Sequence, residues 1–297
     1  GLFPWDNFKE LGDMGLLGIG IDEEYGGSGG STRLVALAAE EIARGCAATS
    51  VVYIAHLSLC TQFINRYGNE DQKNKYLPDL ASGKKVGAFA LTEPGAGSDA
   101  AAITTNSVRA NGHLVVNGNK TYISNAPEAS VIVTLATRDH SLSHKGIDAL
   151  IIDGDLEGVT VNKLAGKMGV RASTVGEIIF DNCHVPVVNQ MGGDGVGFRQ
   201  TMEVLNASRI SIAAQCVGIA QAALEASIEY ARNRKAFGGT LSDLQAIQWM
   251  VADMATETEA ARQLVMNTAS LRDAGLPFNT EASMAKLFGS RVAMDAA

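Results

Sequence analysis

Apolar positions recur at helical spacing through the first 85 residues of the chain. The segment Ser31–Arg44 is rich in alanine and leucine and predicts a helix. Further helices are predicted over Ser50–Tyr67 and Asp71–Leu80, and Gly68 is a suitable residue to end the first of these two. The glycine-rich turn Tyr25–Gly30 follows no strand of β-branched residues, so a dinucleotide-binding loop is not favoured there.

The pattern changes at Val86, where short apolar or alternating runs replace the helical spacing. Strands are predicted over Val131–Leu135, Ala149–Ile152 and Glu177–Phe180, buried on one or both faces. The pairs Asn111-Gly112 and Asn117-Gly118 are hairpin signals between such runs. Several short strands at this spacing indicate an antiparallel sandwich or barrel.

From Gly197 onward the helical spacing returns, with apolar residues on two sides of the first helix. A helix of this kind is buried in a bundle or at a subunit interface. A second long helix is predicted over Leu244–Leu271, a break at Gly275–Pro277, and a third helix over Glu281–Ala297.

We therefore predict an α+β multidomain fold. It comprises an N-terminal α-helical domain over residues 1–85, a central antiparallel β-sandwich or barrel domain over 86–195, and a C-terminal helical bundle over 196–297. The third helix reaches Ala297 without a capping residue, so we expect the bundle to be incomplete and the chain truncated.

Composition narrows the class of protein. A formal net charge of −8, with no basic stripe, argues against a nucleic-acid-binding protein. The chain has no run of about 18 apolar residues, so no transmembrane span is predicted. No secretory signal is visible. The four cysteines show no metal-binding or redox spacing, so we expect reduced thiols and no metal.

The run Ala90–Asp99 carries the most specific chemistry in the chain. It combines two hydroxyls, two carboxylates, a proline and two glycines in one short turn. Glycine lets the backbone approach a ligand closely, and successive N–H groups in such a turn accept anions. Alone, the run predicts no more than a polar ligand, and a turn without a ligand is the alternative.

Three further blocks follow it in order: Gly118–Ala126, Asn206–Arg209, and Arg234–Gly238 with Leu244-Gln245. Together the four blocks resemble the acyl-CoA dehydrogenase family of flavoproteins, over essentially the whole chain, and its short-chain and branched-chain members most. The resemblance implies the three-domain layout predicted above and FAD as the cofactor.

The resemblance also implies which residues hold the flavin. The first block lies under the ring, with backbone and hydroxyl groups holding the ring edge and the pyrophosphate, and the second places an aromatic side chain on the ring and a hydroxyl near its reactive nitrogen. Glu93 is assigned a structural role instead, because a carboxylate next to proline in a tight turn usually bonds local backbone. The implied cofactor residues in these two blocks are Phe89, Ala90, Leu91, Thr92, Gly97, Ser98, Tyr122, Ile123 and Ser124.

The remaining blocks concern substrate and assembly. Ser98, Asn206 and Arg209 match positions that bind acyl-CoA, although many relatives have Asp where this chain has Asn206. A structural ion pair is the alternative for Arg209. Residues reaching the FAD of a neighbouring subunit match Arg234, Phe237 and Gln245, and a solvated helix end is the alternative for the arginine. The resemblance thus implies a homotetramer.

The implied reaction is α,β-dehydrogenation of a short or branched acyl-CoA to the 2-enoyl-CoA, with electrons passed to an electron-transfer flavoprotein. No catalytic base is assigned within the chain, because Ser208 stands where some relatives carry it and Glu203 matches neither known position. The expected glutamate lies beyond Ala297. Side chains near Tyr53–Leu59 and around Ala90 are expected to set pocket depth, but acyl length is left open.

Other functions remain open on the same fold: an acyl-CoA oxidase, a flavin monooxygenase, or a non-catalytic flavin-binding protein. The resemblance places the protein in the bacterial cytoplasm or the mitochondrial matrix.

Overall fold

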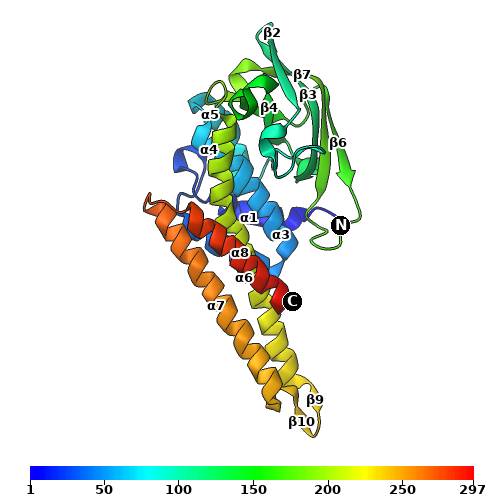
Figure 1. The fold of residues 1–297 in the computed structure, drawn as a ribbon, viewed down its shortest axis with the longest axis vertical. Helices are drawn as coiled ribbons and strands as arrows, with labels where there is room; N and C mark the ends of the chain where they lie inside the picture. The colour runs from blue at the N-terminus through cyan, green and yellow to red at the C-terminus, as the bar shows by residue number, and fades with distance from the viewer. The chain divides into compact units, whose positions relative to one another are not determined.

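The computed structural model describes residues 1–297, which divide into two compact units. The first, here the β unit, comprises residues 1–30 and 51–205. The second, the helical unit, comprises residues 31–50 and 206–297. Along the chain, helical, β and helical segments follow one another, so the predicted fold class is confirmed (Figure 1).

The helices of the chain match the predicted spacing closely. Ser31 caps α2 through its side chain, and Asn69 begins α5 with a reciprocal capping box to Gln72. The predicted helix up to Tyr67 is one continuous rod, but its middle, η3 (Ala55–Thr61), is π-helical. The α-helices are α1 (Trp5–Asp13), α2 (Thr32–Gly45), α3 (Ala47–Ile54), α4 (Gln62–Tyr67), α5 (Glu70–Ala81), α6 (Gly197–Asn233), α7 (Gln245–Asp273) and α8 (Asn279–Ala296).

The strands of the β unit form one sheet in the order β6-β7-β3-β2-β4-β5-β8, with β1 pairing beside β4. Most pairings are antiparallel, as predicted. The pairings of β1 and β2 with β4 are parallel, which the sequence pattern did not predict. The strands are β1 (Gly87–Ala90), β2 (Asn106–Ala110), β3 (His113–Ser124), β4 (Val131–Thr137), β5 (Ile147–Asp153), β6 (Val159–Leu164), β7 (Val175–Pro186) and β8 (Gln190–Met191).

One hairpin prediction was right and the other wrong. Asn111-Gly112 forms the turn between β2 and β3, and both residues have positive φ. Asn117-Gly118 lies inside β3, where the pairing with β7 shifts register, so it is a bulge and not a turn. Gly118 has a φ of 150°, and a Cβ there would meet Thr105 at 2.5 Å, so only glycine suits this position.

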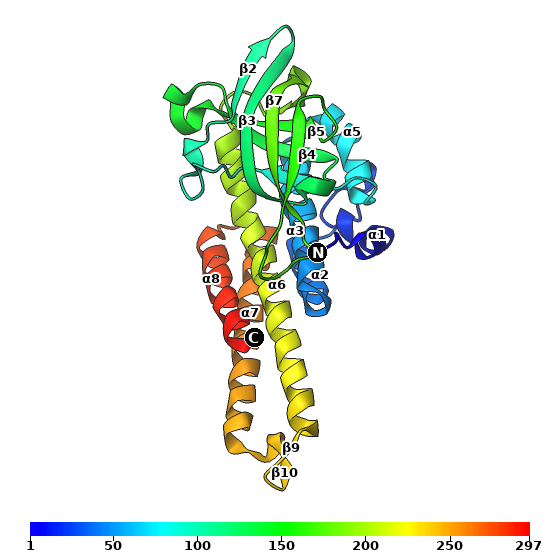
Figure 2. The same cartoon turned by 90° about the vertical axis from the view of Figure 1, so that its right-hand side faces the viewer.

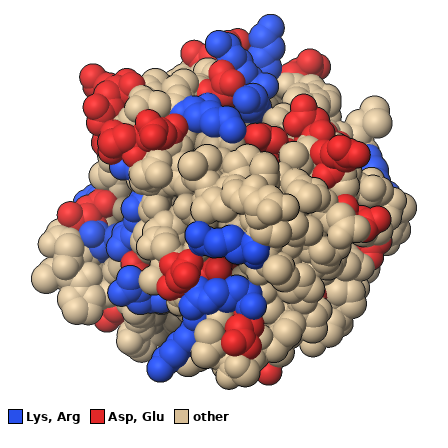
Figure 3. All heavy atoms as spheres, turned by 90° about the horizontal axis from the view of Figure 1, so that it is seen from above, with Lys and Arg blue, Asp and Glu red and all other residues tan.

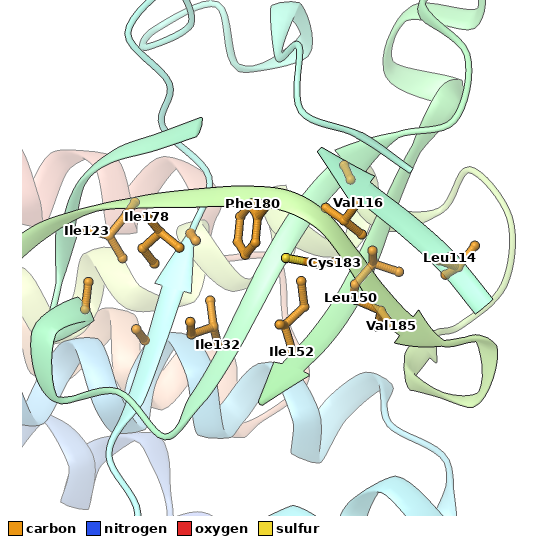
Figure 4. Close-up of a cluster of buried hydrophobic side chains, with 14 residues drawn as sticks. Leu114, Val116, Ile123, Ile132, Leu150, Ile152, Ile178, Phe180, Cys183 and Val185 are labelled. Carbon is orange, nitrogen blue, oxygen red and sulfur yellow. The ribbon is translucent and has the colours of Figure 1, made fainter. Parts of the chain in front are cut away.

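The core of the β unit lies between the strands. Figure 4 shows side chains of β3, β4, β5 and β7, among them Val116, Ile132, Ile152 and Phe180, gathered in one buried cluster. Because both faces of β4 and β5 are covered, these strands read as mostly apolar runs without a polar face.

The helical unit is a bundle in which α6, α7 and α8 run side by side (Figure 2). A short hairpin, β9 (Lys235–Ala236) and β10 (Gly239–Thr240), connects α6 to α7 at one end of the pair. Arg262 of α7 joins three helices, because it bonds Glu40 of α2 at 2.8 Å and Gln221 of α6 at 2.9 Å.

Two helical rods, Ala47–Tyr67 and Gly197–Asn233, are long and apolar enough to cross a membrane, contrary to the sequence expectation. In the most apolar stretch of each, 78% and 50% of the residues are buried inside the protein. Core helices of soluble proteins have the same length and composition, so these helices are weak evidence for a membrane span.

Charge is mixed on the surface that Figure 3 shows. Lys and Arg side chains stand there in small groups next to Asp and Glu, with uncharged surface between them. No continuous basic stripe crosses this face.

Candidate functional site

The turn that follows β1 directs its carbonyl oxygens into the β unit. A trans peptide is planar, so the N–H of each following residue points the opposite way. The N–H of Thr92 is therefore directed away from Lys120. The acceptor contacts are Ala90 with Thr134 Oγ1 at 3.0 Å, Leu91 with Lys120 Nζ at 3.1 Å, and Thr92 with the N–H of Thr121 at 2.9 Å.

Glu93 has the structural role that its sequence context predicts. Its carboxylate accepts hydrogen bonds from the N–H and hydroxyl of Thr104, from the N–H of Thr105, and from Lys120 Nζ at 2.8 Å. Burial acts to raise the pKa of Glu93, but the Lys120 ammonium and these hydrogen bonds outweigh it and lower the pKa to about 2. A carboxylate so engaged is not a general base at neutral pH.

The glycines of the turn leave open space around them. A Cβ at Gly95 or Gly97 would meet nothing within 4 Å, and neither residue has a positive φ. The chain itself therefore does not require glycine at either position. Close approach of a bound molecule to the backbone is the physical reason that remains.

A pocket of about 250 Å³ lies directly after Ser98, which is itself exposed. The hydroxyl of Thr137 in its wall is buried and has no hydrogen-bond partner within the chain. Such a polar lining suits a hydrophilic ligand. The lining residues are Asp99, Ala101, Ala102, Ile103, Thr137, His140 and Ser143.

Tyr122 has an unusual conformation for an aromatic residue. Its φ is +59°, in the left-handed region, and its side chain is 73% exposed. It lies where the register between β3 and β7 shifts, and Thr121 beside it bonds the turn at Thr92. An exposed apolar ring on a strained backbone gains nothing from the rest of the chain, so contact with a ligand is the favoured explanation.

Phe89 and Ile123, two other predicted cofactor residues, are buried. The ring of Phe89 lies 5.8 Å from that of Phe63, and Ile123 belongs to the core cluster. These side chains face the protein interior, so the backbone is what either residue can offer a ligand. Ser124, at the end of β3, is partly exposed.

The predicted assembly residues gather around the hairpin of the helical unit. Phe237 and Gly238 form its turn with φ values of 51° and 84°, and the Phe237 ring is 94% exposed. A turn with two positive φ values favours Asn-Gly, so phenylalanine is costly there. Arg234 and Gln245 are exposed on either side and make no side-chain hydrogen bond within the chain.

The residues predicted to line the substrate channel lie on α6. Arg209 is exposed and donates a hydrogen bond to Asn206, so its charge is bonded to a neutral amide. Ser208 is buried. Glu203 accepts hydrogen bonds from the Tyr67 hydroxyl at 2.6 Å and from Arg66 at 3.1 Å, which leaves it in a structural role.

The predicted residues thus fall in two groups. The β unit brings together the turn after β1, Tyr122 and Ser124, and the helical unit carries Asn206, Arg209 and the hairpin residues. Groups of His, Cys, Asp and Glu able to hold a metal ion are absent from the chain.

Sequence reasoning missed the importance of Lys120 and Asn125. Lys120 is fully buried, and Asn125 donates hydrogen bonds to Val52 and Gly87 from a left-handed backbone. A lysine in the alternating pattern of a core strand was the available signal for the first.

Comparisons with known proteins match the whole chain to one family. Three family models match in succession: the acyl-CoA dehydrogenase N-terminal domain over residues 1–84, the middle domain over 88–183, and the C-terminal domain over 195–297.

This chain also aligns with most of the length of individual relatives. The short-chain specific acyl-CoA dehydrogenase of Clostridium acetobutylicum is 43% identical over 99% of this chain and 77% of its own. The butyryl-CoA dehydrogenase structure of Megasphaera elsdenii has a TM-score of 0.97 and 37% identity, over 99% of this chain and 78% of that one. A structure described for the electron transferring flavoprotein of Acidaminococcus fermentans, in work on flavin-based electron bifurcation, has a TM-score of 0.97 and 42% identity, with coverage of 99% and 78%.

Proposed function

Because the chain belongs to the acyl-CoA dehydrogenase family, we propose that it removes two hydrogens across the Cα–Cβ bond of a short or branched acyl-CoA, with FAD as cofactor. Relatives named for short-chain acyl-CoA and butyryl-CoA support the short substrate. The observation that carries the proposal is Tyr122, an exposed ring in strained backbone beside the turn that follows β1.

The residues present fit a flavin dinucleotide. The N–H of Thr92, directed away from Lys120, suits an acceptor on the ring edge, the Tyr122 ring offers a stacking surface, and the Ser124 hydroxyl offers a donor. Open glycine backbone at Gly97 and the hydroxyl of Ser98 suit a phosphate. When bound, FAD supplies the hydride acceptor that amino-acid side chains lack.

The chain's own part in the chemistry is binding and orientation. The pocket after Ser98 is polar and open to solvent, which suits the hydrophilic part of a CoA thioester better than its acyl chain. Arg209 is exposed and bonded to a neutral amide rather than to a carboxylate, which supports its role in binding acyl-CoA. Neither Glu93 nor Glu203 is free to take the α-proton.

We further propose a homotetramer in which Arg234, Phe237 and Gln245 reach the FAD of a neighbouring subunit. Their exposure supports this, as do large apolar side chains exposed on α7 and α8. These apolar residues are Trp249, Met250, Leu264, Met284, Leu287 and Met294.

An electron-transfer flavoprotein is the proposed electron acceptor, supported by the likeness to the Acidaminococcus structure. The bacterial sources of the relatives support a location in the bacterial cytoplasm, and the mitochondrial matrix is the corresponding compartment in eukaryotes.

Anaerobic titration of the FAD-loaded protein with butyryl-CoA tests the proposed function. Bleaching of the flavin band would support a dehydrogenase, and rapid reoxidation in air would favour an oxidase or monooxygenase instead. Because no base is assigned within residues 1–297, a band that stays oxidised with every acyl-CoA tried would favour a flavin-binding chain without its catalytic base, and failure to bind FAD at all would contradict the cofactor assignment. In the same titration, FAD binding should be weaker in Tyr122→Ala, which removes the ring, than in the control Tyr122→Phe, which keeps it.

A further inference from the structure

The ion pair between Lys120 and Glu93 is buried inside the β unit. Lys120 Nζ and Glu93 Oε1 are 2.8 Å apart, and their side chains are 0% and 2% exposed. Removing two charges from water costs several kcal/mol per ion, and apolar replacements of similar volume are often as stable. Stability alone is therefore a weak reason for an ion pair at this position.

Lys120 controls the orientation of one peptide of the turn. Its ammonium donates to the carbonyl oxygen of Leu91, and the next residue of β3, Thr121, donates to the carbonyl oxygen of Thr92. Two successive residues of one strand thus hold two successive peptides. A cation bonded to the Leu91 carbonyl also polarises that peptide, which makes the N–H of Thr92 a stronger donor.

Glu93 closes the loop that contains Gly97 and Ser98. The carboxylate belongs to the first residue of this loop, and it accepts the N–H groups of Thr104 and Thr105 at the other end. A single side chain therefore joins both ends of the segment 93–104. Lys120 compensates the charge of that carboxylate in the absence of water.

We propose that Lys120 and Glu93 are positioning residues for the cofactor. They fix the N–H of Thr92 and strengthen it as a donor, and they hold the segment 93–104, with Gly97 and Ser98, closed. This inference rests on the proposed FAD site. A stronger donor on a ring acceptor favours the electron-rich reduced ring, so the pair raises the reduction potential of the bound cofactor as well as its affinity.

The test is the double variant Lys120→Met/Glu93→Gln, which removes both charges and nearly keeps the volume. FAD affinity of the apoprotein is measured by fluorescence quenching, and the reduction potential of the loaded protein by dye equilibration. We expect at least tenfold weaker FAD binding and a lower potential. The matched control is Arg262→Met/Glu40→Gln, which removes an ion pair of the helical unit and leaves the turn untouched.

Wild-type affinity and potential in a folded double variant would overturn the inference while leaving the proposed function intact. If the wild-type protein itself fails to bind FAD, the proposed function fails first. A second measurement compares the pH dependence of FAD affinity in the wild type and in the double variant. Burial lowers the pKa of Lys120 to about 8, partly opposed by Glu93, the ionisable group that faces it. FAD affinity of the wild type should then decrease above about pH 8, and an equal decrease in the double variant would also overturn the inference.

Discussion

His56 accepts a hydrogen bond through Nδ1 from the backbone N–H of Gly87, 2.9 Å away, at the start of β1. Its Nε2 lies 3.0 Å from the carbonyl oxygen of Leu80 and donates to it, which fixes the neutral tautomer. The ring is fully buried, and burial lowers the pKa of His56 to about 4. The strand that leads into the turn at Leu91 and Thr92 is thus held by an unprotonated imidazole.

This arrangement predicts a specific loss of stability in mild acid. The folded pKa lies below the ordinary value, so the unfolded chain binds the proton first, and the free energy of unfolding falls as the pH falls below about 6.5. The contribution is about 2 kcal/mol between pH 6.5 and 5, at about 1.4 kcal/mol per pH unit. Urea unfolding at both values should show it in the wild type and not in His56→Gln. Equal pH dependence in the two proteins would show that His56 is not responsible. Glu93, whose pKa is also lowered, adds to the loss of stability only as the pH falls below about 4.5, outside this window.

Phe237→Asn should stabilise the protein and impair cofactor binding at the same time. Asparagine is the favoured residue for the first central position of this turn, so relief of strain is expected to contribute about 0.5–1 kcal/mol. The substitution also removes the ring that we propose contacts the FAD of a neighbouring subunit. Thermal unfolding of the apoprotein and FAD titration measure the two effects separately. Unchanged FAD affinity would argue against a cofactor role for Phe237, and Phe237→Tyr is the control that keeps an aromatic ring.

Gly97→Ala should leave the fold intact and weaken FAD binding at least tenfold. A methyl group meets no neighbour there, and the backbone is one that alanine adopts, so apoprotein stability is expected to stay the same or rise by about 0.5 kcal/mol. Unaltered FAD affinity would mean that no ligand approaches this backbone closely.

Gly118→Ala provides the opposite case. Its φ of 150° and the contact with Thr105 predict a loss of about 3 kcal/mol, because the nearest atoms include backbone that cannot rotate away. Urea unfolding of the apoprotein checks this value. A loss below about 1 kcal/mol would show that the bulge in β3 relaxes.

Arg262→Met should destabilise the helical unit by about 3 kcal/mol, because Glu40 would remain buried without its partner. Adding Glu40→Gln should restore much of that loss, since the uncompensated charge disappears. The free energies of unfolding of the wild type, the two single variants and the double variant give the coupling energy. Additive losses would show that the two groups act independently.

The sequence predicted what depends on local pattern. The helix after Ser31 followed from its alanine- and leucine-rich composition, the end of the next helix from Gly68, and the strands from apolar runs. It misjudged Asn117-Gly118 because the same two residues suit a turn and a bulge, and the choice depends on Thr105, which packs against Gly118 from another segment. The parallel pairing of β1 with β4 likewise depends on contacts between distant residues.

For the site, the sequence identified the residues that carry chemistry and missed those that hold them. Lys120, His56 and Asn125 act through burial and through hydrogen bonds to distant backbone, neither of which one sequence displays. The left-handed conformations of Tyr122 and Phe237 were equally hidden, because both residues ordinarily avoid that region.

The π-helical turn Ala55–Thr61 gives this rod a distinct evolutionary freedom. An i→i+5 hydrogen bond encloses one more residue than an i→i+4 bond, so the rod behaves as a regular helix that has absorbed a one-residue insertion. Deleting one residue within this turn would restore α-helical spacing while the ends of the rod stay anchored, so only the side chains inside the turn would change direction. Single insertions and deletions here could therefore remodel the side chains of this turn without changing the fold around them.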